Sequence, residues 1–326
     1  MTIKTGTVSI LAMLATAPAF ADCGTVTFSD VGWTDITATT AATTVVLESL
    51  GYDTDIKVLS VPVTYTSMAS GDIDVFLGNW MPTMEADIAP YRKAGTVDTV
   101  RANLEGAKYT LAANRAATDL GIRDFADIAP HADSLDSKIY GIEAGNDGNR
   151  LIMDMINADA FGLNGFDVVE SSEQGMLAQV ARADRKGDPI IFLGWEPHPM
   201  NANFDMSYLT GGDNYFGPNL GGATVFTNTR AGYVSECPNV GKLLENLEFS
   251  LDMENEIMAA ILDDGQDPDA AAKACLSGSP RAGPNTLRAS DYPARGHQHN
   301  LHRLRGTHGL GHRTQNPGRE MGQGRF

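Results

Sequence analysis

The strongest constraint on the fold is a strand–helix alternation that runs through the chain twice. In the first half, strand, helix, strand, helix and strand are expected over 25–32, 36–52, 53–61, 64–72 and 73–80. A strand followed by an amphipathic helix and another strand forms a parallel pair with a right-handed crossover. The sequence therefore predicts an α/β fold with a mainly parallel sheet flanked by helices.

The second half of the chain repeats this order. Strands are expected over 137–145, 167–172 and 189–197, with amphipathic helices over 149–163 and 173–187 between them. The length of the chain also suits two compact lobes better than one. Each lobe is therefore expected to contain its own sheet of this kind.

Two further segments are expected to connect the lobes. Residues 107–115 have the pattern of an extended crossover, and residues 222–230 that of a strand returning to the first lobe. The first lobe is therefore predicted to be discontinuous, over 22–111 and 213–280, with the second lobe over 112–212.

The third strand of each half ends in the same phrase, Phe-Leu-Gly followed within two residues by a tryptophan. These tryptophans are Trp80 and Trp195, and the third tryptophan of the chain, Trp33, follows the first strand. Ligands of open α/β sheets bind at the carboxyl ends of strands. A tryptophan there can instead simply cover the core. All three tryptophans lie at strand ends, and they come from two lobes that can face each other. This arrangement favours a shared aromatic site.

The charge of the chain points to the class of ligand. Residues 22–280 carry 15 basic and 39 acidic side chains, a net charge of −24. Such a surface is unfavourable for nucleic acid or an anionic membrane and favourable for a cation. Aromatic faces attract cations by about 0.5–1 kcal/mol when exposed and about 2 kcal/mol or more when desolvated. They can thus bind a quaternary ammonium, which has no N–H to donate.

No catalytic motif accompanies these residues. The nucleophile elbow, the zinc-protease helix, the phosphate loop and the dinucleotide fingerprint are all absent from the sequence. Before residue 281 the chain has two histidines, His131 and His198, and neither lies near a nucleophile or a set of metal ligands. We therefore expect a binding protein rather than an enzyme, with no catalytic residue, no metal and no cofactor.

The two ends of the chain differ in composition from the rest. Residues 1–21 contain an early lysine, a mostly apolar stretch and an Ala-Phe-Ala sequence, the pattern of a secretory signal peptide. We therefore expect export to the periplasm. Residues 281–326 are rich in Gly, Arg and His with almost no apolar periodicity, and are expected to be a disordered basic tail.

Three cysteines in an oxidising compartment leave one over. Cys23 lies beside the expected mature N-terminus and Cys237 far along the chain, so a bond between them would tie the terminus to the body. Cys275 would then be the free thiol. On the residues alone, any two of the three could pair.

Five segments occur in an order that matches a known family: SDVGWTDI, FLGNWMPT, AKYTLA, GIEAGNDGNR and FLGWEPHPMN. They resemble the periplasmic choline-binding proteins of bacterial ABC importers, in the wider group that also binds glycine betaine and proline betaine. The resemblance covers about 22–276. It implies a type II periplasmic binding protein whose two lobes close over a ligand cleft, about a hinge near residues 110 and 212. It also supports the pairing of Cys23 with Cys237.

The resemblance also implies a role for particular residues. The trimethylammonium group would lie in an aromatic box, and a carboxylate and an amide would hold the hydroxyl end. The protein would be a monomer that captures choline in the periplasm and passes it to an ABC permease in the inner membrane. Family members continue past residue 276 into further tryptophan-containing sequence, whereas this chain continues into the basic tail. The implied ligand-binding residues are Trp33, Trp80, Tyr109 and Trp195 for the box, and Asp35 and Asn146 for the hydroxyl end.

Asp35 distinguishes between the possible ligands. A betaine carboxylate needs donors and would be repelled by an ionised aspartate, whereas the hydroxyl group of choline can donate to it. Asp35 also precedes a helix, so it could be an N-cap instead, and the helix that starts near Asn146 could bind a carboxylate. Choline is thus the expected ligand, with glycine betaine or proline betaine as the alternative. A choline-ester hydrolase would need a nucleophile and base, and no such pair is visible. We expect three further candidates to lie behind the residues that contact the ligand or at the surface: Glu196, Asp147 and His198.

Overall fold

The protein is described by a computed structural model over residues 23–278. The expected signal peptide (1–21) and basic tail (281–326) lie outside the described residues. Within 23–278, no helix combines the length and the apolar character needed to cross a lipid bilayer. The helices and strands, in chain order, are β1 (Thr25–Asp30), α1 (Thr34–Ser49), β2 (Asp53–Val58), α2 (Val61–Ser70), β3 (Val75–Met81), α3 (Glu85–Ala94), β4 (Val97–Asn114), α4 (Arg115–Asp119), β5 (Lys138–Tyr140), α5 (Asp147–Asn157), β6 (Asp167–Val169), α6 (Glu173–Lys186), β7 (Ile191–Glu196), α7 (Met200–Asn203), β8 (Met206–Tyr208), α8 (Asp213–Phe216), α9 (Pro218–Gly221), β9 (Gly222–Arg230), α10 (Tyr233–Glu236), α11 (Pro238–Asn246), α12 (Leu251–Leu262) and α13 (Pro268–Gly278).

The strands form one sheet in the order β2-β1-β3-β9-β4-β7-β5-β6, with β8 beside β4. β1 pairs in parallel with β2 and β3, and β5 pairs in parallel with β6 and β7. These two parallel triplets confirm the two predicted alternations and the α/β fold class. Between them, β4 and β9 are antiparallel to each other and to their outer neighbours. The mainly parallel arrangement is therefore confined to the triplets.

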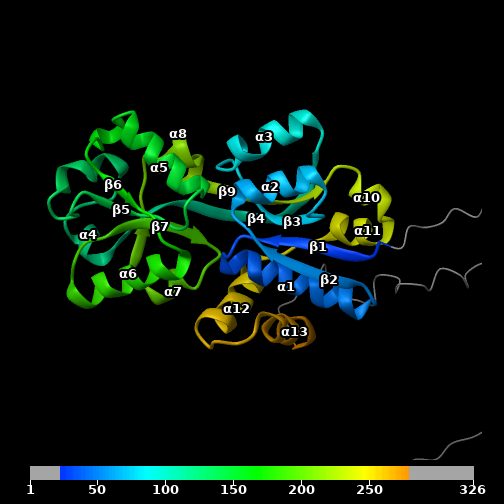
Figure 1. Ribbon diagram of the computed structural model, residues 1–326. Helices are drawn as coiled ribbons and strands as arrows, with labels where there is room; N and C mark the ends of the chain where they lie inside the picture. The colour runs from blue at the N-terminus through cyan, green and yellow to red at the C-terminus, as the bar shows by residue number, and fades with distance from the viewer. Residues whose placement is uncertain (1–22, 279–326) are drawn as a thin grey trace, which may run out of the picture.

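Strand β4 joins the two triplets and explains the antiparallel centre. Its first part pairs with β9, and its second part pairs with β7. Figure 1 shows β4 running between the half that contains β1–β3 and the half that contains β5–β7. As predicted, residues 222–230 form a strand, β9, that returns beside β3. Helix α3 separates β3 from β4 in the chain, but β4 does not pair with β3. Because β4 and β9 are antiparallel to their neighbours, the crossover rule for parallel strands does not apply to them.

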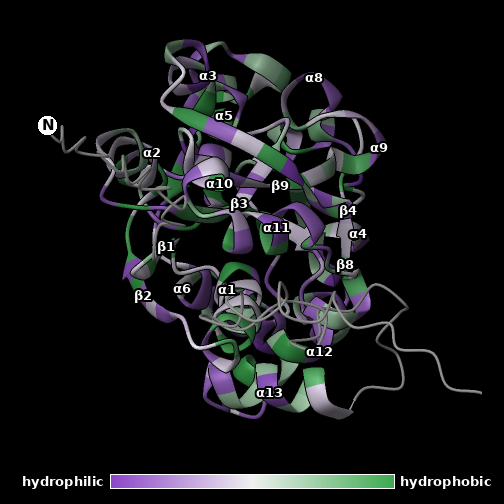
Figure 2. Cartoon of the chain, turned by 90° about the vertical axis from the view of Figure 1, so that its right-hand side faces the viewer, coloured by the Kyte–Doolittle hydropathy of each residue, from purple (hydrophilic) through white to green (hydrophobic). Residues whose placement is uncertain are grey.

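Helix α1 is buried on nearly every side. It lies between the sheet and the C-terminal helices α12 and α13 (Figure 1). Three of its buried threonines satisfy their hydroxyl groups locally: Thr39, Thr43 and Thr44 each donate to the carbonyl four residues earlier, at 2.8–3.0 Å. Helices α12 and α13 mix polar and apolar residues (Figure 2), as outer covering helices do. The packing on both sides holds the N-terminus of α1 in a fixed place.

A disulfide ties the start of the described chain to its later part. Cys23 and Cys237 are bonded, with their Cα atoms 5.5 Å apart, which confirms the expected pairing. The bond connects the residue before the turn into β1 with the start of α11. Cys275 is free and buried in α13.

Reduction of this disulfide should lower the free energy of unfolding. The bond closes a loop with a sequence separation of 214 residues, and loss of such a restraint on the unfolded chain costs about 2–4 kcal/mol. Urea denaturation with and without dithiothreitol measures the effect. In a control with Cys23→Ser and Cys237→Ser, which keeps Cys275, the reductant should change nothing. An unchanged midpoint on reduction of the native chain would contradict the prediction.

Candidate ligand-binding site

A cavity with an empty volume of about 260 Å³ lies where residues from both parallel triplets meet. All six residues expected to bind the ligand line it, together with two others. The lining residues are Trp33, Asp35, Trp80, Tyr109, Ile142, Asn146, Asp147 and Trp195.

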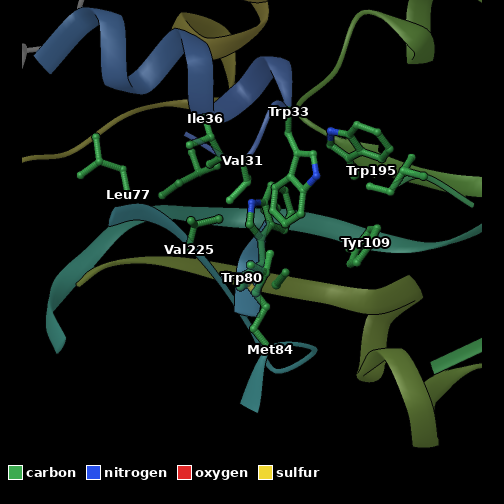
Figure 3. Packing of buried hydrophobic residues seen from close by; sticks show 14 of the residues in the cluster. Val31, Trp33, Ile36, Leu77, Trp80, Met84, Tyr109, Trp195 and Val225 are labelled. Carbon is green, nitrogen blue, oxygen red and sulfur yellow. Dashed lines mark hydrogen bonds between the residues drawn. The ribbon is translucent and has the colours of Figure 1, made fainter. Parts of the chain in front are cut away.

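The four aromatic side chains come from four different elements. Trp33 occupies the N-cap position of α1, directly after β1. Trp80 and Trp195 lie near the ends of β3 and β7, one residue before each strand stops. Tyr109 comes from β4 and lies opposite Trp195 in the strand register. Figure 3 shows these side chains converging from α1, β3, β4 and β7.

The rings stand at steep angles to one another. The centroids of Trp80 and Tyr109 are 6.0 Å apart with planes at 61°, and those of Tyr109 and Trp195 are 6.3 Å apart with planes at 82°. Each of these side chains, and that of Trp33, is at most 5% exposed. Rings at such angles can present their faces to a shared space, where a desolvated cation is attracted most strongly.

Asp35 lies in the first turn of α1 and is 2% exposed. Its Oδ2 accepts a hydrogen bond from Trp80 Nε1 at 3.1 Å, while its Oδ1 has no partner among the described residues. Burial, reinforced by the charge of nearby Glu173, raises the pKa of Asp35 to about 8. The N-cap alternative is wrong, because Trp33 holds that position and no side chain of the N-cap residue caps the helix.

The start of α5 forms the opposite wall. Asn146 is its N-cap, and Asn146 Oδ1 accepts from Asn149 N at 3.0 Å and from the Tyr109 hydroxyl at 2.9 Å. Asn146 Nδ2 donates to Asp147 Oδ1 at 3.1 Å. A Cβ at Gly148 would overlap the Tyr109 hydroxyl, so this close approach requires glycine. Asn146 therefore combines a capping role with a place on the cavity wall.

From the sequence, Asp147 was expected to lie behind the residues that contact the ligand. This prediction is wrong, because Asp147 forms part of the cavity wall. Asp147 lines the cavity at 1% exposure, and its Oδ2 has no partner among residues 23–278. Burial raises the pKa of Asp147 to about 7. The strand-end rule that selected Asn146 applies equally to its neighbour and could have found it. Ile142, also on the wall, carries no chemical signal in the sequence.

The other two lesser candidates lie outside the cavity lining, as expected. Glu196 forms an ion pair with Lys108 at 2.6 Å. His198 is buried behind Trp195, with ring centroids 4.8 Å apart. No lysine or arginine is among the residues that line the cavity. Within the described part of the chain, no group of three or more His, Cys, Asp or Glu residues could hold a metal ion. The site thus combines aromatic walls with two buried carboxyl groups.

Two triplets of parallel strands joined by antiparallel strands, with a cavity lined from both, define a type II periplasmic binding protein. The family comparison is more specific. The family of the substrate-binding domain of ABC-type glycine betaine transport systems matches residues 24–277, and the chain belongs to it. Members of this family are binding proteins of transporters rather than enzymes, and substrate-binding proteins of ABC importers act outside the cytoplasm.

Two solved structures are closely similar. One is an ABC-transporter choline-binding protein in complex with choline: it is 73% identical, with a TM-score of 0.77, and the match covers 78% of this chain and 88% of that one. Another is an ABC-transporter choline-binding protein in an unliganded semi-closed conformation, 71% identical with a TM-score of 0.75, covering 81% and 91%. An uncharacterised protein of Chromohalobacter salexigens is 49% identical over 142 residues, which are 44% of this chain and 92% of that protein.

The raised pKa of Asp35 predicts how stability depends on pH. The folded protein keeps a proton that the unfolded chain loses near pH 4, so stability should fall as the pH rises toward about 8. Asp35→Asn cannot titrate. The free energy of unfolding of Asp35→Asn should therefore increase relative to that of the native chain between pH 5 and 8, by at most about 1.4 kcal/mol per pH unit.

Urea denaturation at a series of pH values measures this difference. Asp154→Asn, at an exposed position in α5, is the matched control and should run parallel to the native chain. Parallel curves for Asp35→Asn and the native chain would show that Asp35 ionises normally when buried.

Proposed function

We propose that this chain captures choline in the periplasm and delivers it to an ABC permease in the inner membrane. The observation that carries the proposal is a cavity with four buried aromatic side chains and two buried carboxyl groups, and with no basic side chain on its wall. The choline complex of a 73% identical protein supports it. In this proposal the chain works as a monomer, carries out no reaction and is exported through residues 1–21.

The trimethylammonium group of choline would lie among Trp33, Trp80, Tyr109 and Trp195. Each face would contribute about 2 kcal/mol in a desolvated site, and burial of the methyl groups would add to this. Asp35 would balance the positive charge through Oδ1, which has no hydrogen-bond partner among residues 23–278. The hydroxyl end would reach the start of α5, where Asn146 and Asp147 offer a donor and an acceptor.

Capture would require the cleft to open. The aromatic walls are at most 5% exposed, so a ligand cannot reach them in this conformation. We propose that residues 22–111 and 213–280 form lobe 1, that residues 112–212 form lobe 2, and that the lobes hinge near residues 110 and 212. Lobe 1 then supplies Trp33, Asp35 and Trp80 and lobe 2 supplies Asn146, Asp147 and Trp195, so that only the closed form offers the whole site.

Glycine betaine is the second candidate, because the family is described by that substrate. Its carboxylate would need hydrogen-bond donors. The Trp33 and Trp80 indole N–H groups already donate to Glu143 and Asp35. Asn146 and the backbone N–H groups at the start of α5 could serve as donors, and the helix dipole there favours an anion. Against this stands the ionisable pair Asp35 and Asp147, which line the same cavity.

Removal of one aromatic face should weaken choline binding strongly. Trp195→Ala should raise the dissociation constant roughly 30-fold or more, because about 2 kcal/mol of attraction is lost. Calorimetric titration measures this, and circular dichroism confirms that the variant folds. Trp195→Phe keeps an aromatic face and should lose much less. The proposal fails if the folded native chain does not bind choline, or if Trp195→Ala binds choline as tightly as the native chain.

The two ligands should respond to pH in opposite directions. Choline favours ionised Asp35, whose pKa in the buried site is about 8, so its binding should release protons and strengthen as the pH rises from 6 to 8. A betaine carboxylate favours the protonated form and should bind more weakly over the same range. Titrations in buffers of different ionisation heat count the protons released.

Asp35→Asn is the control, because position 35 then cannot titrate. In this variant the affinities for choline and for betaine should change much less with pH, and the remaining change should come from Asp147. A choline affinity that stays constant between pH 6 and 8 would contradict this account of the charge in the cavity.

A further inference from the structure

We propose that Glu173 holds the two lobes together in the closed form, and we call its contact with Thr34 the latch. Glu173 belongs to lobe 2 and caps α1, the helix of lobe 1 that carries Trp33 and Asp35. The inference rests on the proposed function, which it deepens by naming what holds the closed form together. It concerns a residue outside the cavity lining, 139 positions away from its partner in the sequence.

The first observation is that helix α1 lacks a cap of its own. Its N-cap residue, Trp33, makes no side-chain capping hydrogen bond, and the Asp35 carboxylate accepts from the Trp80 indole N–H through Oδ2. The first N–H groups of a helix need acceptors, and a buried helix start cannot obtain them from water. The acceptor comes instead from Glu173, at the start of α6.

The second observation is the geometry of this contact. Glu173 Oε2 accepts from Thr34 N at 2.7 Å, and Glu173 Oε1 accepts from the Thr34 hydroxyl at 2.5 Å. Glu173 is 1% exposed and Thr34 is 4% exposed. Hydrogen bonds to a charged acceptor are roughly twice as strong as neutral ones. Both donors belong to the residue that lies directly between Trp33 and Asp35.

The third observation is that lobe 2 holds Glu173 in position. His198 Nδ1 accepts from Met200 N at 2.9 Å, so the neutral ring carries its proton on Nε2 and donates to Glu173 Oε1 at 3.2 Å. The His198 ring also packs edge-on against Trp195, with planes at 72°. A continuous set of contacts therefore runs from Trp195 through His198 and Glu173 to Thr34.

One other set of contacts between the proposed lobes, that of Arg150, is more accessible to water. Arg150 reaches the Thr83 carbonyl at 3.1 Å and Asp87 at 2.8 Å, but its side chain is 32% exposed. Water can replace partners of that kind with little loss. Glu173 differs because in the closed form its two donors from lobe 1 are sealed from solvent. Without the carboxylate, closure would bury the Thr34 N–H without an acceptor, so the closed form would be penalised.

Three variants test the latch. Glu173→Ala removes it, and Thr34→Val removes one donor while leaving every charge in place. Thr34→Ser keeps the hydroxyl and should restore the native behaviour. Gln174→Ala, at an exposed position of α6, is the matched control. Stopped-flow tryptophan fluorescence gives the association and dissociation rates of choline, and small-angle X-ray scattering gives the radius of gyration without ligand.

We expect faster release with little change in association. The dissociation rate should rise roughly 10- to 100-fold in Glu173→Ala and about 10-fold in Thr34→Val. The ligand-free radius of gyration should be larger in both variants than in the native chain. Because Thr34→Val changes no charge, faster release there separates the latch from a loss of attraction for the cation.

Two outcomes would overturn the proposal. One is a choline dissociation rate in Glu173→Ala and Thr34→Val equal to that of the native chain. The other is a ligand-free radius of gyration that neither variant changes. If the native chain does not bind choline at all, the proposed function fails, and the scattering measurement still decides whether Glu173 holds the lobes together.

Discussion

The structure depends on one unusual electrostatic constraint, the burial of two carboxyl groups that each have one oxygen without a hydrogen-bond partner in the described part of the chain. Asp35 Oδ1 and Asp147 Oδ2 are in this position, on opposite walls of the same cavity. An uncompensated buried polar group is costly, and a buried charge more so, which is why the pKa of each carboxyl group is raised. A small cation would supply the missing charge without a hydrogen-bond donor, and the aromatic walls would bind the rest of it.

Helix α1 connects this site to the remainder of the fold. Its buried sides lie against the sheet and against α12 and α13, so its start cannot shift without disturbing two layers of packing. Trp33 and Asp35 therefore reach the cavity from a rigid support. The same helix leaves the Thr34 N–H to be satisfied from outside, and Glu173 of α6 accepts its hydrogen bond. The contact of Thr34 with Glu173 therefore affects both the stability of the fold and the position of Trp33 and Asp35 in the site.

Local sequence patterns predicted much of this, and the contacts between distant segments account for the rest. Periodicity located the two parallel triplets, and the strand-end rule with the family resemblance located six of the eight cavity residues. The antiparallel centre was not predicted, because β4 pairs with β7 and β9, which lie far along the chain. For Asp35, the sequence could not distinguish an N-cap residue from a cavity residue, because an aspartate just before a predicted helix is compatible with either role. Glu173 has no local signal because its partner is 139 residues away.

The distribution of the site over two lobes determines how selective closure can be. A ligand shifts an equilibrium only by the difference in its affinity for the two states. If the open form offers one wall of the cavity and the closed form both, most of the attraction for a quaternary ammonium is gained on closure. The contact between Glu173 and Thr34 favours closure whether or not a ligand is present. That contact must therefore be weak enough for the ligand-free lobes to open, and strong enough for one small cation to complete the closed form. Burial raises the pKa of Asp35 and Asp147 and so opposes their ionisation, and in the proposed function a bound cation would favour the ionised forms.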